Sequence, residues 1–218
     1  MTIAPPRHNE PAAAKAYRAL ERMIVTLELP PGSVTTEGAL IEQLDLGRTP
    51  VREAVQRLAW DGLVEVRPRA GLAIAPLAAG DWIRVIDARR GVEEVLARSA
   101  ARYATPELSI RFKDAAMSMQ RAVISGNVIA FLEADKALDE AMGVAADNPF
   151  AARLAAPLQT HSRRFWFRYQ SDSGLADAAE HHVKVIRAIL DGDADDAGKQ
   201  AKRLMALLRS NAEKAIRR

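Results

Sequence analysis

The positions of proline and glycine divide this chain into two parts with different hydrophobic patterns, and this division constrains the fold more than any other feature. Before Pro76, three segments with helical spacing of apolar residues are followed by two short alternating segments. After Gly80, every segment between helix breakers has helical periodicity. The sequence therefore predicts a mainly α protein with two domains, residues 1–76 and residues 80–218, the second being an all-α helical bundle.

The order of elements in the first part is typical of a winged helix-turn-helix. A helix ends before Pro30, and Thr36 can cap a short second helix. A third helix begins near Thr49, where the following proline is tolerated because amides of the first turn lack helical partners. Residues 63–66 and 72–75 alternate as short strands do. We expect three helices followed by a β-hairpin wing.

Individual arginines, and not bulk charge, indicate a nucleic-acid partner. The chain carries a net charge of +3, but residues 1–78 hold 9 basic and 9 acidic side chains. Arg48 and Arg52 lie four apart, on the face of the third helix opposite its apolar stripe. An α-helix fits the major groove, where arginine donates two hydrogen bonds to guanine. A solvated charged face is the alternative, and for the wing residues Arg67 and Arg69 a solvent-exposed turn is nearly as good an explanation.

The segment LDLGRTPVREAVQRL (residues 44–58), followed by DGLV (61–64) and PRAG (68–71), resembles the signature of the GntR family of bacterial regulators. Gly47 departs from it, because the family usually has serine there. The resemblance implies a DNA-binding winged helix-turn-helix in which Arg48 and Arg52 contact bases or flanking phosphates. It also implies that Arg57 supports binding to the backbone. The predicted DNA-binding residues are Arg48, Thr49, Arg52, Arg57, Arg69 and Gly71.

The second part resembles the helical effector-binding domain of the FadR subgroup, called FCD, through segments that include residues 89–93, 135–139, 148–149 and 182–189. Many members of that subgroup hold a divalent metal with an aspartate, a histidine four residues later and two further histidines. Asp135 and His182 match two of these positions. Asp139 and Leu204 stand where the subgroup has the other two ligands.

Helical periodicity directs several polar residues of this part inward. Asp135 and Asp139 share a face with Leu132 and Met142, and His182 aligns with Ile186. His161 is expected to be inward with Leu154, Leu158 and Phe165, and Arg89 and Glu93 with Trp82 and Ile86. Burying unpaired charge is costly, so the pattern favours a polar ligand cavity. A hydrogen-bonded core histidine and an ion pair within the bundle are the alternatives. The predicted effector-binding residues are Arg89, Asp135, Asp139, His161, Arg164 and His182.

A metal site of Asp135, Asp139 and His182 would have three protein ligands, because Leu204 offers no lone pair. We therefore predict weak or absent metal binding, with the aspartates offset by protons, water or a nearby cation such as Arg89 or Arg164. Arginine binds carboxylates in a forked geometry, which favours an organic acid as the effector.

The sequence thus predicts a DNA-binding transcription regulator, acting as a repressor, that reads a palindromic operator as a homodimer. A small metabolite in the helical domain is expected to alter its DNA affinity. The chain has no cysteine, no apolar run long enough for a membrane and no signal-peptide pattern, so we expect a cytoplasmic protein. A constitutive DNA-binding protein with a ligand-free dimerisation domain is one alternative. A metal-dependent enzyme is less favoured, because no nucleophile–base arrangement is recognisable.

Overall fold

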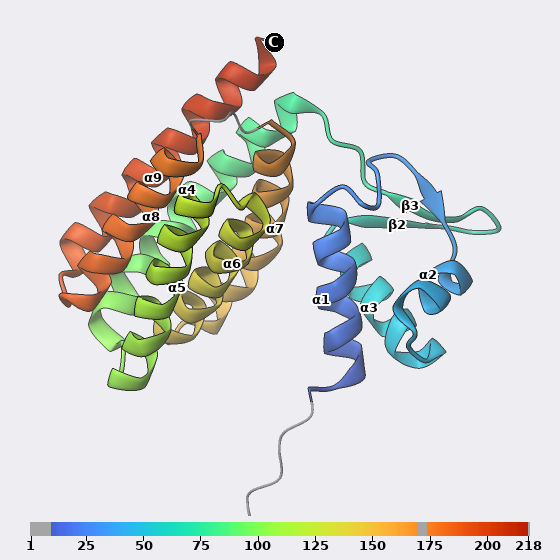
Figure 1. The fold of residues 1–218 in the computed structure, drawn as a ribbon, viewed down its shortest axis with the longest axis horizontal. Helices are drawn as coiled ribbons and strands as arrows, with labels where there is room; N and C mark the ends of the chain where they lie inside the picture. The colour runs from blue at the N-terminus through green and yellow to red at the C-terminus, as the bar shows by residue number, and fades with distance from the viewer. Residues whose placement is uncertain (1–9, 170–173, 218) are drawn as a thin grey trace, which may run out of the picture. The chain divides into compact units, whose positions relative to one another are not determined.

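The computed structural model describes residues 10–169 and 174–217 (Figure 1). They form two compact units, and the boundary along the chain falls between Pro76 and Leu77. The first unit contains α1 (Ala12–Val25), β1 (Val34–Thr35), α2 (Glu37–Leu44), α3 (Arg48–Trp60), β2 (Val64–Arg67) and β3 (Gly71–Ile74). The second contains α4 (Ala79–Tyr103), α5 (Pro106–Ser125), α6 (Val128–Ala145), α7 (Pro149–Tyr169), α8 (Gly174–Leu190) and α9 (Ala194–Ile216).

The core of the first unit lies between α1, α3 and the sheet. Leu20 and Ile24 of α1 and Val51 and Leu58 of α3 are fully buried there, as the helical spacing predicts. The hydroxyl of Thr36 accepts a hydrogen bond from the amide of Ala39 at 3.1 Å and so caps α2. This satisfied amide fixes the start of α2.

The sheet has three strands in the order β1-β3-β2, all antiparallel, so the wing is one strand larger than the predicted hairpin. In the additional pairing, Val34 lies opposite Ala73 and Thr35 opposite Leu72. A strand of two residues is too short to show an alternating pattern, and for this reason periodicity did not reveal β1.

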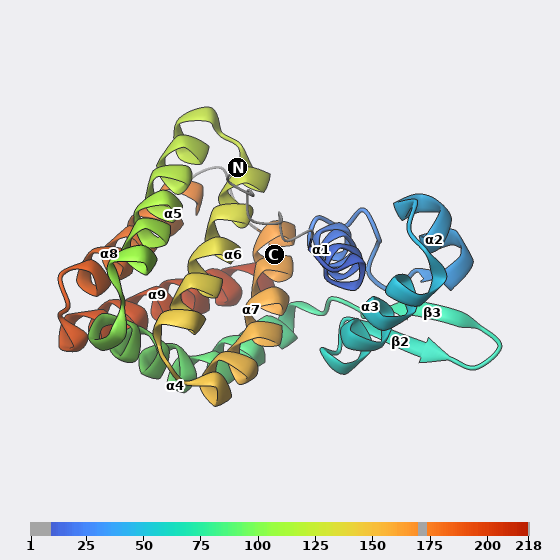
Figure 2. The same ribbon diagram turned by 90° about the horizontal axis from the view of Figure 1, so that it is seen from below.

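The second unit is a bundle in which α4 packs against α9 and α7, and α5 packs against α6 and α8 (Figures 1 and 2). Its buried side chains include Trp82 and Ile86 of α4, Phe112 and Met119 of α5, and Ile186 of α8. Trp82 stacks on Phe165 of α7, with ring centroids 6.1 Å apart. The predicted mainly α fold, with an N-terminal winged helix-turn-helix and a C-terminal helical bundle, is confirmed.

Among the described residues, no helix combines the length and the apolar character that crossing a membrane requires.

Candidate functional site

Helix α3 presents three of the predicted DNA-binding residues on its outer face. Arg48, Thr49 and Arg52 are exposed, whereas the opposite face of the helix lies in the core. The Arg52 guanidinium lies 3.3 Å from a carboxylate oxygen of Glu37 at the start of α2. Surface ion pairs of this kind contribute at most about 1 kcal/mol to stability. Arg52 can therefore leave Glu37 at little cost and bind a base edge.

Arg57 contacts the ring of Tyr17, which the sequence did not indicate. Its guanidinium carbon lies 3.9 Å from the centre of the Tyr17 ring, a cation–π distance. The Tyr17 hydroxyl donates a hydrogen bond to Asp61 at 2.8 Å, and burial together with nearby carboxylates raises the pKa of Tyr17. Arg57 thus joins α3 to α1, and its exposed side chain stands at the edge of the helix-turn-helix.

The wing turn holds Arg69 exposed, in the left-handed region with φ +64°. Arg67 is paired with Glu65 at 2.8 Å. Gly71 has φ +94°, and a Cβ at this position would lie 2.5 Å from the carbonyl oxygen of Thr35. Glycine is therefore required at residue 71 for the approach of β1 to β3, a reason that appears only with the third strand. Its contact with DNA stays a prediction.

In the helical unit, charged side chains from four helices are buried together. The cluster comprises Arg89 and Glu93 of α4, Asp135 and Asp139 of α6, Arg163 of α7 and His182 of α8. Arg89 and Glu93 form an ion pair at 2.8 Å, and the Gln159 amide donates a hydrogen bond to Glu93 at 3.1 Å. The bundle ion pair considered as an alternative for Arg89 and Glu93 is therefore present.

Arg163 lies between the two aspartates of α6. Its Nη1 is 2.5 Å from Oδ2 of Asp139 and 3.5 Å from Oδ2 of Asp135, and its Nη2 donates to the Thr160 hydroxyl at 3.0 Å. The sequence indicated Arg89 or Arg164 as a cation that offsets the aspartates, and it did not indicate Arg163. The two neighbouring arginines project from different sides of α7, and periodicity alone did not decide which one faces α6.

His182 contributes the third positive charge of the cluster. Its Nδ1 lies 2.6 Å from the carbonyl oxygen of Ala178, and its Nε2 lies 2.8 Å from Oδ1 of Asp135. A carbonyl and an ionised carboxylate both only accept hydrogen bonds, so each ring nitrogen carries a proton. When all three carboxylates of the cluster are ionised, the three cations balance their charge.

The pKa values of these groups follow from burial and from each other's charges. Burial opposes ionisation of Asp135, but the charges of His182, Arg163 and Arg89 outweigh it and lower its pKa to about 2. Burial lowers the pKa of His182, but Asp135 outweighs it and the net shift is upward. Burial and the negative charge of Asp135 raise the pKa of Asp139 to about 7, against the effect of Arg163.

A small cavity of about 20 Å³ lies inside this cluster, close to the space that one water molecule needs. Arg89, Asp135 and His182, three of the predicted effector-binding residues, line it together with Arg163 and Trp166, and their binding of an effector stays a prediction. Asp139, which pairs with Arg163, does not line the cavity. His161 and Arg164 do not line this cavity, although Arg164 is completely buried and burial lowers its pKa to about 10.

The inward stripe predicted for α7 is confirmed at Phe165, which is buried, and is wrong at Leu154. Leu154 is 67% exposed, and His161, placed on the same stripe, is only half-buried. The buried face also carries the polar residues Gln159, Thr160, Ser162 and Arg163. Gln159 pairs with Glu93 of α4, and Arg163 pairs with Asp139 of α6. Because α7 also has an apolar residue on its outward face, Leu154, the spacing of apolar residues did not predict its buried face correctly.

The three predicted metal ligands do not fit a metal ion in this arrangement. Arg163 occupies the position between Asp135 and Asp139 that a cation would take, and Nε2 of His182 is hydrogen-bonded directly to Asp135. Leu204 is a buried apolar residue. Throughout residues 10–169 and 174–217, no three histidine, aspartate or glutamate side chains are grouped so that they could hold a metal. Weak or absent metal binding by Asp135, Asp139 and His182 stays a prediction.

The first unit is a winged helix-turn-helix with exposed arginines on its third helix, and it is joined to a helical domain with a buried charged cluster. This architecture is that of a DNA-binding regulator. Residues 12–74 match the gntR family of bacterial regulatory proteins, and residues 84–207 match the FCD domain. The chain belongs to the GntR family of transcription regulators and carries an FCD domain.

Named relatives agree with this assignment. The chain is 30% identical over 168 residues to the "Probable D-xylose utilization operon transcriptional repressor" of Paenarthrobacter nicotinovorans, covering 77% of this chain and 74% of that protein. It is 27% identical over 193 residues to the HTH-type transcriptional repressor RspR of Escherichia coli K12, covering 86% and 82% of the two chains. Both relatives are named as transcriptional repressors, and the gntR family is described as one of bacterial regulatory proteins.

Solved structures show the same fold. Escherichia coli McbR/YncC superimposes with a TM-score of 0.79 at 16% identity, over 94% of this chain and 99% of that one. A GntR transcriptional regulator from Rhodococcus sp. RHA1 superimposes with a TM-score of 0.71 at 20% identity, over 93% and 97% of the two chains.

Proposed function

We propose that this regulator is a repressor that binds a palindromic operator as a homodimer and is controlled by a small organic acid bound in its helical domain. Arg48, Thr49 and Arg52 read the major groove, Arg57 and Arg69 contact phosphates, and Gly71 holds the wing backbone close to DNA. Two relatives carry the word repressor in their names, and this supports the direction of regulation.

The buried charged cluster is the observation that carries the effector proposal. Moving each charge out of water costs several kcal/mol, and replacing buried ion pairs by apolar residues is often neutral or stabilising. A bundle that served only for dimerisation would gain nothing from six charged side chains at one point of its core. Four of the six, Arg89, Asp135, Arg163 and His182, line one cavity, and this supports a ligand-binding role.

The chemistry of the lining favours a carboxylate ligand. Arg89 and Arg163 both face the cavity, and a guanidinium binds a carboxylate through two parallel hydrogen bonds. The cavity has room for about one water molecule, so an acid enters only if Arg163 leaves Asp135 and Asp139 to bind it. Binding then replaces contacts between α6 and α7 by contacts with the ligand. A ligand can change DNA affinity only if it makes different contacts in the two conformations of the regulator, and this exchange of contacts provides such a difference.

The test begins by selecting operators from random duplex DNA with the purified protein. The selected operator is then titrated in the presence of short monocarboxylates, dicarboxylates and sugar acids, and release is measured by fluorescence anisotropy. We expect at least one acid to release the DNA from the parent protein. Arg163→Gln should bind DNA but lose this response, whereas Arg153→Gln, on the exposed face of the same helix, should retain it.

The outcomes separate the alternatives. Sequence-selective binding that no acid alters would favour the constitutive regulator with a ligand-free dimerisation domain. Failure to enrich any sequence would contradict the DNA-binding assignment itself. An acid response that Arg163→Gln leaves unchanged would place the effector outside the charged cluster.

A further inference from the structure

Helix α5 carries three large apolar side chains that are exposed at intervals of seven residues. Ile110 is 60% exposed, Met117 44% and Ile124 87%. Residues seven apart lie on nearly the same line along a helix, because two turns contain 7.2 residues. Single exposed apolar residues are normal on a protein surface, but a line of them with heptad spacing is the pattern of a helix that packs against another helix.

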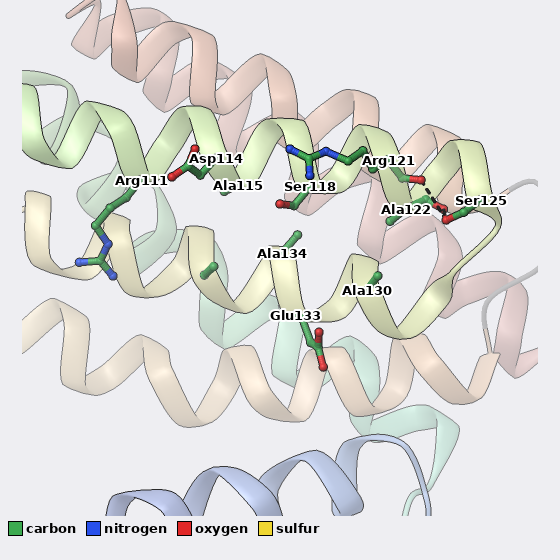
Figure 3. A pocket seen from close by; sticks show the side chains of 11 residues that line it. Arg111, Asp114, Ala115, Ser118, Arg121, Ala122, Ser125, Ala130, Glu133 and Ala134 are labelled. Atoms are coloured by element: carbon green, nitrogen blue, oxygen red, sulfur yellow. Dashed lines mark hydrogen bonds between the residues drawn. The ribbon is translucent and has the colours of Figure 1, made fainter. Parts of the chain in front are cut away.

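A groove runs beside this line, between α5 and α6 (Figure 3). Its volume is about 520 Å³, far larger than that of the cavity inside the charged cluster. Small side chains form its floor: Ala115, Ser118 and Ala122 from α5, and Ala130 and Ala134 from α6. A second helix can approach closely over residues of this size, with its larger side chains entering the groove.

Charges on α5 are arranged so that this face complements itself. Asp114 precedes Met117 by three residues and Arg121 follows it by four, and both line the groove. At 100° per residue they lie on the same side of the apolar line. In a two-fold antiparallel pair centred on Met117, Asp114 of one copy therefore lies beside Arg121 of the other. Within residues 10–169 and 174–217, neither Asp114 nor Arg121 forms an ion pair.

The same pairing aligns the remaining residues favourably. Ile110 of one copy lies opposite Ile124 of the other, because the two are equally distant from Met117. Lys113 lies on the other side of the line and is opposite Gln120, so it does not oppose Arg121. Two-fold interfaces use one surface patch twice, and a patch must then complement itself in shape and charge.

From these features, and resting on the homodimer of the proposed function, we infer that two copies of this chain pair through α5. The helices run antiparallel across a two-fold axis at Met117, each apolar line packs on the other, and Asp114 and Arg121 form two ion pairs between the copies.

Cross-linking tests the register, because the chain contains no cysteine and each introduced thiol is unique. Met117→Cys should form a covalent dimer on oxidation, since the two copies of residue 117 face each other across the axis. Ile110→Cys and Ile124→Cys should each cross-link poorly alone and efficiently when mixed. Leu154→Cys, exposed on α7, is the matched control and should stay monomeric under denaturing, non-reducing conditions.

Sedimentation tests the energetics without a cross-link. Ile124→Asp should raise the dimer dissociation constant by about tenfold or more, because it places a charge in each of the two Ile110–Ile124 contacts, whereas Leu154→Asp should leave it unchanged. Asp114→Arg and Arg121→Asp should each weaken the dimer, because each places like charges together. The double variant D114R/R121D should recover affinity, since the ion pairs reform with their signs exchanged.

The results distinguish a failure of the α5 interface from a failure of the homodimer itself. A monomeric parent protein, free and on DNA, would contradict the homodimer of the proposed function. A dimeric parent that Ile124→Asp does not weaken, and that Met117→Cys does not cross-link, would overturn the α5 interface alone. A dimer broken by Leu154→Asp would place the interface on α7 instead.

Discussion

Arg163 and Asp139 form a buried ion pair at 2.5 Å between α7 and α6. The two residues are 24 positions apart, and Arg163 also lies 3.5 Å from Asp135. One guanidinium therefore lies between two carboxylates where the FadR subgroup resemblance implies a metal ion.

Replacing Arg163 by methionine should destabilise the helical domain by about 3–5 kcal/mol, because two buried carboxylates would lose their shared cation. Urea unfolding followed by circular dichroism measures the change. The double variant R163M/D139N should recover part of the loss, since Asp135 keeps His182 as its partner. If Arg163→Met unfolded at the same urea concentration as the parent, the ion pair would not form in solution.

Protein purified without chelator or nickel resin should contain well under one equivalent of divalent metal. Arg163 offsets the charge of the aspartates, and Leu204 provides no ligand. Elemental analysis measures the content. About one equivalent that is lost in both Asp135→Ala and His182→Ala would contradict this prediction and assign those residues as ligands.

Arg52→Ala should lower affinity for the selected operator by about 1–3 kcal/mol, the usual value of one bidentate base contact. Glu37→Ala is the control, because it frees Arg52 without removing it and should not weaken binding. Titrations against operator and unrelated DNA measure both. Equal operator binding by Arg52→Ala and the parent would show that α3 does not read the sequence through this residue.

Arg69→Ala should weaken binding to all sequences alike, because a wing arginine contacts phosphates. We expect the slope of log affinity against log salt concentration to become shallower by about one unit. Affinities measured at several salt concentrations test this, and a loss confined to the operator would indicate base readout by the wing.

Gly71→Ala should destabilise the first unit by about 1–3 kcal/mol through strain at a positive φ and a clash with the Thr35 carbonyl. Gly32→Ala provides the comparison, because φ is +77° there but no atom lies within 4 Å of the added Cβ. Thermal unfolding should show the larger loss for Gly71→Ala. Equal losses would mean that only backbone strain, and not the approach of β1, requires glycine at residue 71.

The sequence alone determined that the first unit has three helices followed by two wing strands and that the second unit is helical, but it did not indicate β1. Proline and glycine mark where helices end, and the spacing of apolar residues marks which side of each helix is buried, as in α3 and α8. These are local properties of a few adjacent residues. They were sufficient to predict the winged helix-turn-helix, the helical bundle and the inward direction of Arg89, Asp135 and His182.

Only the tertiary structure decided which residues meet. The pairing of β1 with β3, the choice of Arg163 over Arg164 and the outward face of Leu154 all depend on contacts between segments distant in the sequence. A polar residue becomes favourable in a core when a partner of opposite charge arrives from another helix, and no local pattern encodes that arrival. For this reason the sequence indicated a polar centre in the helical domain, and the packing of α6 on α7 determined its cation.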